Sequence, residues 1–562
     1  MSASTPPAPQ KHALSQLRWA LGVLVLGICL LQGYRVLHDP AHRFSPDSLN
    51  YIDVARNITR GKGIVQSVVG YNEPRFNPAF EMPMPMVSQP PLYPIAVAAL
   101  GGLGVPFPQA ALAVTLLGMP LVIGGAYLLA REANGPEFGE AAAALTVVGL
   151  LVLAPLYVMT HRAWSETLAS GFSLLGMALT LHARRLDTPS NLLLASAGLL
   201  CGLAFATRYV FLPLIPLCAV MLVAFSEPLL RGDRAALRES ARRVLIFLAG
   251  AAILTAPVIM RNLILSGTLL GAERNPSLIS LGTNLYNLYI SLLGRWLDDP
   301  YYWPVLHKLL GVEQSIDFEA QAVVAMAIIV LIGVAASLRN VLSDALFHPQ
   351  RILLTLWAAL YLVTLVWQRT TYHFDPINPR LVFGAYAVMV ALGAGIVART
   401  IRLGPAAALV FAILVALFGF DRAAVQAAAD SREPYRSEMV AVDEMPPLRW
   451  VAENTTARDL IIGDDTVDVV AYLDRPGAVS FSPYPYTTHF THADLTAVLE
   501  RHCPNFERAF LVLHGSQAGG IAWAAEFGPF IHSLVEGDIS GVPEVVSQTP
   551  LEQGMVFALL CP

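Results

Sequence analysis

The feature that most constrains this chain is a series of apolar runs, each about 15–20 residues long, the length of a membrane-crossing helix. Lipid offers the backbone no hydrogen-bonding partner, so a run that crosses a bilayer must be helical. We count about eleven such runs between residues 19 and 420. They predict an α-helical polytopic membrane protein, whose first run is retained because no signal-peptide cleavage site follows it.

The composition agrees with a membrane protein and excludes two other classes. Of the 562 residues, 55% are hydrophobic and 14% are charged, whereas soluble domains carry about 25% charged residues. An ordinary cytosolic enzyme is therefore excluded. The 36 Lys and Arg residues are outnumbered by 41 Asp and Glu residues, so the chain offers no basic surface to nucleic acid. Nearly all the basic residues are Arg, a bias compatible with a GC-rich bacterial genome.

The basic residues indicate an orientation, because Lys and Arg in short loops stay on the cytoplasmic side. With residues 1–18 as a cytoplasmic tail, every loop on that side carries Arg. The outer side then holds two long loops, at about residues 38–91 and 261–319, and a tail of residues 421–562. We expect a multi-pass protein of a bacterial inner membrane with a periplasmic tail.

The outer tail has the composition of a soluble domain and is predicted to be a small α/β domain. Cys503 and Cys561 both lie in it, in a compartment that permits disulfides. We predict that they pair, although two free thiols remain an open alternative. The expected strands are residues 459–462, 478–481 and 508–514, and the expected helices are residues 448–454 and 494–501.

Ionisable residues at the outer ends of the apolar runs are the candidates for function, because charge at such a place is costly unless it is paired or hydrated. They include Asp47, Glu166, Arg208, Arg261, His373 and Arg380. No dedicated metal site is evident from their spacing, and no cofactor is assigned. Two carboxylates on one side could still share acid–base work or hold a divalent metal.

Each acid allows a structural and a functional interpretation. Ser45 and Pro46 predict a helix start, so Asp47 could complement the helix dipole, or act as a general base on a hydroxyl. Ser165 could likewise cap a helix whose first turn holds Glu166. His161 nearby is more often a hydrogen-bonded interfacial residue than a ligand.

The three arginines at outer run ends oppose the usual preference of Arg for the cytoplasmic side. The planar guanidinium suits phosphate oxygens, whereas the alternative is that each side chain extends to lipid headgroups. The residues concerned are Arg208, Arg261 and Arg380.

Several short motifs follow one another on the expected outer side of the membrane. They are Asp47-Ser48-Leu49-Asn50-Tyr51, Ala55-Arg56-Asn57, Gly61-Lys62-Gly63, the "PPLYP"-like Gln89-Pro90-Pro91-Leu92-Tyr93-Pro94, Ser165-Glu166, Ala206-Thr207-Arg208, Pro257 with Arg261-Asn262, and Arg380. Together they resemble the motifs of GT-C-type membrane glycosyltransferases, in the branch of protein mannosyltransferases and aminoarabinose transferases. The resemblance covers about residues 15–420 and depends on the order of the motifs and their common side.

The resemblance implies a GT-C-like domain at residues 19–420 and an inverting glycosyltransferase. Its donor would be a sugar on a polyprenyl phosphate, and its acceptor a hydroxyl or amine of a glycan, lipid or protein. Asp47 would be the base and Glu166 the second external acid, although Ser48 stands where mannosyltransferases often carry another acid. The donor phosphate would be held by Arg380, Arg208 and Arg261, and further candidates are His373, Tyr93 and His161.

Two other functions are weighed against this one. A transporter or flippase of a lipid-linked sugar would usually carry polar residues near the membrane midplane and two related halves. The middles of these runs are almost wholly apolar, and no halves match. A non-catalytic partner could instead recognise saccharide through the Tyr- and Trp-rich stretch at residues 286–303.

Overall fold

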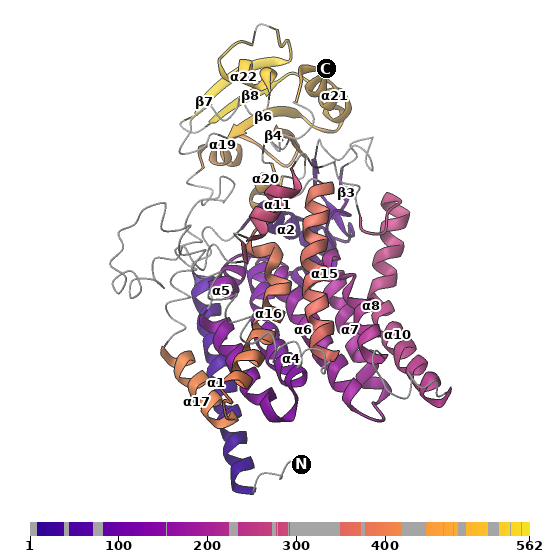
Figure 1. The fold of residues 1–562 in the computed structure, drawn as a ribbon. Coiled ribbons are helices and arrows are strands. Elements are labelled where there is room, and N and C mark those ends of the chain that lie inside the picture. Colours follow the sequence, from indigo (N-terminus) through magenta and orange to yellow (C-terminus); the bar gives the residue numbers. More distant parts are fainter. Residues whose placement is uncertain are drawn as a thin grey trace.

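The computed structural model consists of a helical bundle with an α/β domain at one end (Figure 1). It describes residues 8–38, 44–70, 82–152, 154–223, 234–271, 277, 279–289, 291–292, 349–372, 377–418, 445–464, 466–475, 477–481, 490–514, 528–539, 541–551 and 554–561.

Long apolar helices form the bundle, as the apolar runs predicted. Within the described residues, five helices are long and apolar enough to cross a membrane. The run expected at residues 320–338 lies outside those residues, so the number of about eleven spans is not tested. The bundle helices are α1 (Ala8–His38), α4 (Phe107–Val152), α5 (Ala154–His161), α6 (Glu166–Arg185), α7 (Asn191–Thr207), α8 (Leu214–Val223), α10 (Arg234–Ser266), α15 (Pro349–Thr371), α16 (Pro379–Thr400) and α17 (Pro405–Phe418).

Helix α4 contains two of the expected runs. Gly135 has φ 74° and ψ 179°, a backbone conformation that no helix contains and that favours glycine, and Pro136 follows it. The chain reverses there, since Asn134 lies against Gly395 of α16 whereas the later Gly149 lies against Val390, which is nearer the start of α16. The sequence prediction of separate runs on either side of this point is consistent with the turn.

Small residues let the bundle helices approach closely. A Cβ atom on Gly198 of α7 would lie 1.9 Å from the carbonyl oxygen of Phe247 in α10, so no larger residue fits. A Cβ on Gly118 of α4 would lie 2.6 Å from Thr167 of α6. Such contacts are the usual way in which apolar helices pack where no hydrophobic force drives them together.

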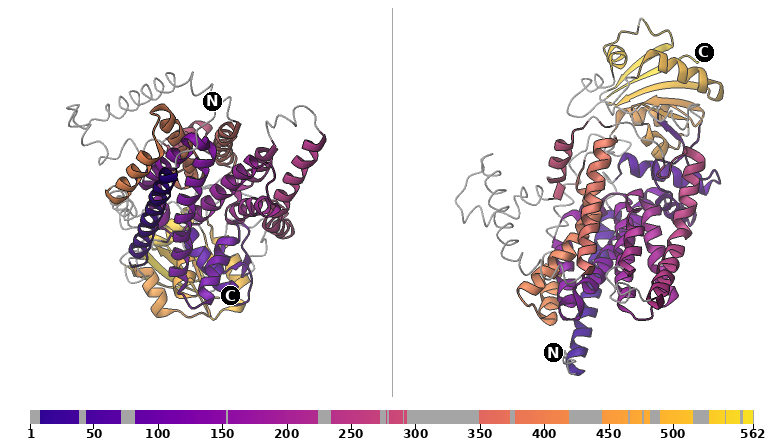
Figure 2. Two further views of the ribbon diagram at one scale, coloured as in Figure 1. Left: turned by 90° about the horizontal axis from the view of Figure 1, so that it is seen from below. Right: turned by 45° about the vertical axis from the view of Figure 1, so that its right-hand side comes forward.

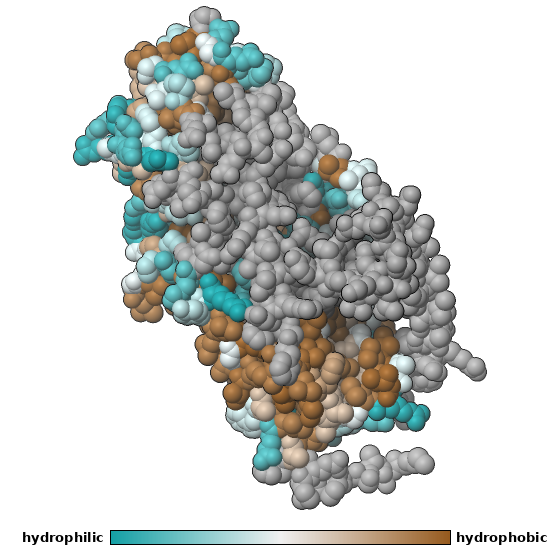
Figure 3. Space-filling model, turned by 90° about the vertical axis from the view of Figure 1, so that its left-hand side faces the viewer, coloured by the Kyte–Doolittle hydropathy of each residue, from teal (hydrophilic) through white to brown (hydrophobic). Residues whose placement is uncertain are grey.

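Arginines of the expected cytoplasmic side lie at one end of the bundle. At the α4 turn, Arg18 pairs with Glu140 (2.7 Å) and Arg185 pairs with Glu132 (2.9 Å). The amino-terminal end of α1 lies at this end of the molecule, and the α/β domain lies at the other (Figure 2). Arginines that we expected on the cytoplasmic side therefore gather opposite the α/β domain. Figure 3 shows apolar side chains over the bundle on one face, with polar side chains toward both ends.

The first long loop begins with helix α2 (Pro46–Thr59) and ends with the short helix α3 (Leu92–Gly102). Ser45 caps α2 as predicted: its Oγ accepts from the Ser48 amide, and the Ser48 hydroxyl accepts from the Ser45 amide. Between the helices lie three short strands, β1 (Val65–Gln66), β2 (Val68–Gly70) and β3 (Met84–Pro85), and β1 pairs with β3.

The α/β domain has the three strands expected from the sequence, together with an unexpected hairpin. A disulfide joins Cys503 to Cys561. The expected boundary at residue 421 lies outside the described residues. The elements are α19 (Pro446–Asn454), β4 (Asp459–Gly463), α20 (Val467–Leu473), β5 (Ala478–Ser480), α21 (His492–His502), η4 (Cys503–Asn505), β6 (Arg508–His514), α22 (Pro529–Val535), β7 (Val545–Leu551) and β8 (Gly554–Leu559).

The sheet of this domain includes a strand from the first long loop. The strand order is β2-β5-β4-β6-β8-β7, and β2 pairs in parallel with β5, with Val68 opposite Ala478. Helix α11 (Leu281–Tyr289), in the second long loop, packs near α15. Residues 68–70 of the first long loop thus form one edge of the sheet of the domain that was expected at residues 421–562.

Candidate active site

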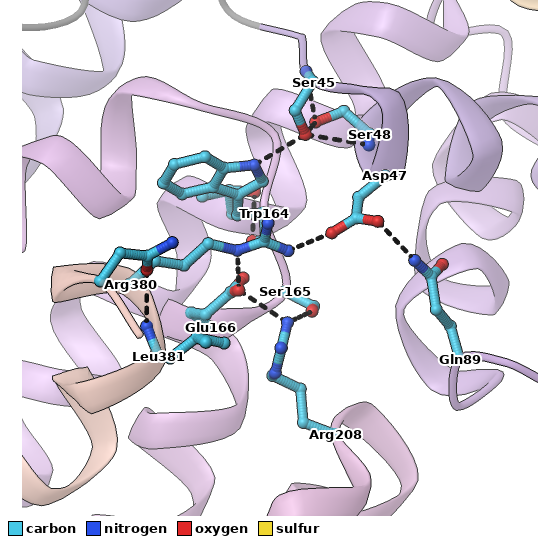
Figure 4. A network of polar contacts seen from close by, with 12 residues as sticks. Ser45, Asp47, Ser48, Gln89, Trp164, Ser165, Glu166, Arg208, Arg380 and Leu381 are labelled. Carbon is cyan, nitrogen blue, oxygen red and sulfur yellow. Dashed lines mark hydrogen bonds and ion pairs between the residues drawn. The ribbon is translucent and has the colours of Figure 1, made fainter. Parts of the chain in front are cut away.

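Two acids and two arginines meet at the end of the bundle below the α/β domain (Figure 4). Arg380 donates through Nη2 to Asp47 Oδ2 and through Nε to Glu166 Oε1. Arg208 donates through Nη1 to the same Glu166 oxygen at 2.6 Å. All four residues were predicted as candidates, and they come from four separate places in the chain.

The four side chains differ in their exposure to solvent. Glu166 is 4% exposed and Arg380 is 9% exposed, whereas the Asp47 side chain is 32% exposed. The formal charges of the two acids and two guanidiniums cancel, which offsets the cost of removing them from water. The Oε2 atom of Glu166 is buried and has no hydrogen-bond partner among the described residues. Asp47 is therefore the more accessible of the two acids.

Local structure places each of these residues. Asp47 lies in the first turn of α2, where Ser45 and Ser48 form the cap, and its carboxylate contacts Arg380 and Gln89 instead of the helix end. Arg380 is the second residue of α16, whose N-cap Asn378 accepts from the Leu381 amide at 3.2 Å. Arg208 is the residue at which α7 ends.

Sequence reasoning missed two neutral residues of the site. Gln89 donates through Nε2 to Asp47 Oδ1 at 2.7 Å. The Trp164 ring lies 4.6 Å from the guanidinium carbon of Arg380, and its Nε1 donates to Ser45 Oγ at 2.8 Å. Gln89 thus orients one acid, and Trp164 supports the arginine that binds both. Gln89 does lie in the motif 89–94, which was the available signal.

The expected capping role of Ser165 is wrong. Ser165 has helical backbone angles and makes no capping hydrogen bond to α6. Its Oγ lies instead 3.3 Å from the Tyr51 hydroxyl and 3.3 Å from Arg208 Nη1. The hydroxyl is used to connect α2 with the end of α7, so Glu166 begins α6 without a side-chain cap before it.

Three other candidates lie in different contacts, and a fourth is not described. Arg261 Nη2 donates to the carbonyl of Ile64 at 3.1 Å, in the first long loop. The Tyr93 hydroxyl is buried and donates to the carbonyl of Ala111 at 2.8 Å. His161 is buried with Nδ1 3.0 Å from Gln32 Nε2, which fits the interfacial interpretation. His373 lies outside the described residues.

A further buried acid stabilises the loop beside the site. Asp53 of α2 is 2% exposed and accepts from the amide and the hydroxyl of Ser67, at 2.5 and 2.8 Å. Asn57 also donates to it, at 3.2 Å. Burial raises the pKa of Asp53 to about 6. Among the described residues, no group of three or more His, Cys, Asp or Glu side chains could hold a metal ion.

Comparison with known proteins identifies the fold. No protein-family model and no curated protein matches the sequence. Among solved structures, ArnT from Cupriavidus metallidurans in the apo state covers 96% of this chain and 98% of its own, with 16% identity and a TM-score of 0.55. The same protein bound to undecaprenyl phosphate covers 95% of this chain and 97% of its own, with 15% identity and a TM-score of 0.54.

An oligosaccharyltransferase from Archaeoglobus fulgidus, in complex with Zn and sulfate, covers 87% of this chain and 68% of its own, with 15% identity and a TM-score of 0.51. These neighbours define a class, that of GT-C membrane proteins. This chain therefore has the GT-C fold that its motifs predicted, and its similarity to ArnT extends over nearly the whole length of both chains.

Proposed function

We propose that this protein is an inverting glycosyltransferase that moves a sugar from a polyprenyl phosphate to an acceptor hydroxyl or amine on the outer face of the membrane. The observation that carries the proposal is the joint contact of Arg380 with Asp47 and Glu166, in a chain with the GT-C fold. A neighbour of this fold is described as bound to undecaprenyl phosphate, which supports a lipid-phosphate donor. No described contact favours the flippase or the saccharide-binding partner.

The proposed reaction exchanges one bond at the anomeric carbon. Asp47 accepts the proton of the acceptor hydroxyl, and the acceptor oxygen attacks the anomeric carbon from the face opposite the phosphate. The bond from that carbon to the phosphate oxygen breaks, and the lipid phosphate leaves with the electron pair. Its added charge is stabilised by Arg380 and Arg208, whose donors are fixed before the reaction.

Glu166 has a different role in this scheme. One of its oxygens accepts from both arginines, and its side chain is nearly inaccessible to solvent. A carboxylate in that position holds two guanidiniums side by side, although their like charges repel. We therefore assign Glu166 to positioning the phosphate-binding arginines and Asp47 to the proton transfer.

The experiment is turnover of undecaprenyl-phosphate sugars by the purified full-length protein, with a bacterial envelope extract as acceptor and release of undecaprenyl phosphate as the signal. Asp47→Asn should lower the rate by about 100-fold or more, as loss of a general base does. The cap of α2 does not depend on Asp47, but the variant loses the ion pair to Arg380, so thermal unfolding is measured beside the rate to separate the two effects.

Asp187→Asn is the matched control, since it removes a carboxylate from an exposed position after α6, at the other end of that helix from Glu166. It should leave turnover unchanged. Near-normal turnover by Asp47→Asn would remove Asp47 from the reaction. Failure of the wild-type protein to release undecaprenyl phosphate from any sugar donor would overturn the proposed function itself.

A further inference from the structure

Helix α2 contacts the α/β domain through Arg56. Arg56 Nη1 donates to the carbonyl of Val470 at 2.9 Å, and Nη2 donates to the carbonyl of Ala471 at 2.9 Å. Nη1 also lies 3.3 Å from Asp474 Oδ1. These acceptors belong to the last turn of α20 and the residue after it, and the Val470 carbonyl also accepts from the Asp474 amide at 3.1 Å. Arg56 is thus a carboxyl-terminal cap supplied to α20 from another part of the chain.

Arg56 and Asp47 lie on opposite sides of α2. They are nine positions apart, which is about two and a half turns of an α-helix. Asp47 therefore faces the arginines of the bundle while Arg56 faces α20. An aromatic contact also joins this region to α20: the Phe44 ring, just before α2, lies 6.4 Å from the Tyr472 ring, edge to face. Only 14% of the Arg56 side chain is exposed.

A second connection runs from α2 to the sheet of the α/β domain. Asp53 accepts from Ser67, and Asn57 donates to the carbonyl of Val65 at 3.0 Å. Strand β2, which begins one residue after Ser67, pairs with β5, and β5 follows α20 in the chain. Helix α2, the strand after it and the α/β domain therefore form a closed ring of contacts. In that ring Arg56 makes the direct side-chain link from α2 to α20.

From this geometry we propose that Arg56 is a positioning residue, through which the α/β domain holds α2 and so keeps Asp47 at the distance that proton transfer requires. The proposal rests on the proposed function. At the end of α2 that carries Asp47, the carboxylate is bound by Gln89 and Arg380, whereas the other end is held by Arg56. A displacement of about 1 Å at a reacting group can lower a rate by about 100-fold.

Arg60, the residue at which α2 ends, provides a matched control. It donates through Nη1 to the carboxylate of Asp474 at 2.8 Å, so it shares a partner with Arg56. Its side chain is 42% exposed, and an ion pair at such an exposed position contributes little. Removal of Arg60 takes the same charge from the same contact region and leaves the bonds to the α20 carbonyls in place.

The test compares Arg56→Ala, Arg56→Lys and Arg60→Ala in the full-length protein in lipid nanodiscs. Hydrogen exchange of α2 and α20 and turnover of an undecaprenyl-phosphate sugar are measured on each. Arg56→Ala should increase exchange in both helices and lower kcat on the order of tenfold, with the KM for the donor unchanged. Arg56→Lys should lie between, because an ammonium group cannot bind the acceptors as a fork. Arg60→Ala should resemble wild type.

Equal exchange and equal kcat in Arg56→Ala and Arg60→Ala would overturn the proposal. If Arg56→Ala fails to fold, Arg56→Lys decides, since it keeps the charge and the stem: wild-type kcat in that variant also overturns the proposal. If the wild-type protein transfers no sugar, the proposed function fails, and the exchange measurement alone still shows whether Arg56 couples the two helices.

Discussion

At the scale of single residues, Arg380 is the group with the most connections in the site. Its guanidinium contacts both carboxylates and lies over the ring of Trp164. In the proposed reaction the same guanidinium also donates hydrogen bonds to the phosphate. A charge-assisted hydrogen bond contributes about 1.5–3 kcal/mol. Arg380→Ala should therefore weaken binding of undecaprenyl phosphate by about 10- to 100-fold, measured by titration calorimetry.

The control for Arg380 must separate lost binding from unbalanced charge. Arg380→Ala leaves two carboxylates with Arg208 as their remaining cation within the group of four, which disfavours the folded site. The double variant with Asp47→Asn restores the balance and should fold normally yet still bind weakly. Arg380→Lys should recover part of the affinity. Wild-type affinity in the stable double variant contradicts a role in phosphate binding.

The charged half of the site could be predicted from sequence, and the neutral half could not. Ionisable residues at apolar run ends are rare and costly, so Asp47, Glu166, Arg208 and Arg380 stood out. Gln89 is neutral and common at such places, and its importance comes from a bond to a residue 42 positions away. The same rule selected Arg261, which donates to a backbone carbonyl in the first long loop. The sequence around Arg261 does not indicate that contact.

At the scale of elements, the sequence predicted the helix starts and strands that depend on neighbouring residues. Helix α2 begins where Ser45 and Pro46 indicated, and strands β4, β5 and β6 lie where short apolar runs were seen. The hairpin of β7 and β8 was missed because no residue of β7 is fully buried and the strand holds a proline. Strand β8 is apolar, but without β7 its short run does not indicate a hairpin. Strand β2 has three residues, and nothing in three residues names a partner in another domain.

Helix α21 ends in a buried histidine, from which we predict that the α/β domain loses stability in acid. His502 is buried, its Nε2 has no hydrogen-bond partner among the described residues, and burial lowers its pKa from 6.5 to about 4, helped by Arg501. The unfolded chain then binds a proton that the folded domain does not, so this stability is complete above pH 6.5 and is lost as the pH falls toward 4.

His502→Gln should flatten that dependence. Thermal unfolding measures the effect: as the pH falls from 6.5 to 4, the Tm of the wild-type protein should fall more steeply than the Tm of the variant. His532→Gln in α22 is the comparison, because its side chain is 46% exposed. A wild-type slope in the His502 variant would show that the acid sensitivity has another origin.

At the scale of the whole molecule, the position of the arginines along the bundle predicts how the protein lies in the membrane. Arginines gather at the end opposite the α/β domain, where Lys and Arg normally remain in the cytoplasm. Alkaline phosphatase fused after Arg243 should be inactive, and the same enzyme at the carboxyl end of the chain should be active. An active fusion after Arg243 would reverse the side assigned to every site residue.

The pairing of β2 with β5 also sets an order of assembly. Gly70 and Ala478 are separated by about 400 residues, which take roughly 20–80 s to synthesise at about 5–20 residues per second. Over that interval the emerging first loop has no β5 to pair with, so its edge is open to proteases and chaperones. The sheet therefore receives its edge strand β2 only after residue 480 has been made, and a foreign domain grafted in place of the α/β domain would need an open strand edge to receive Val68–Gly70.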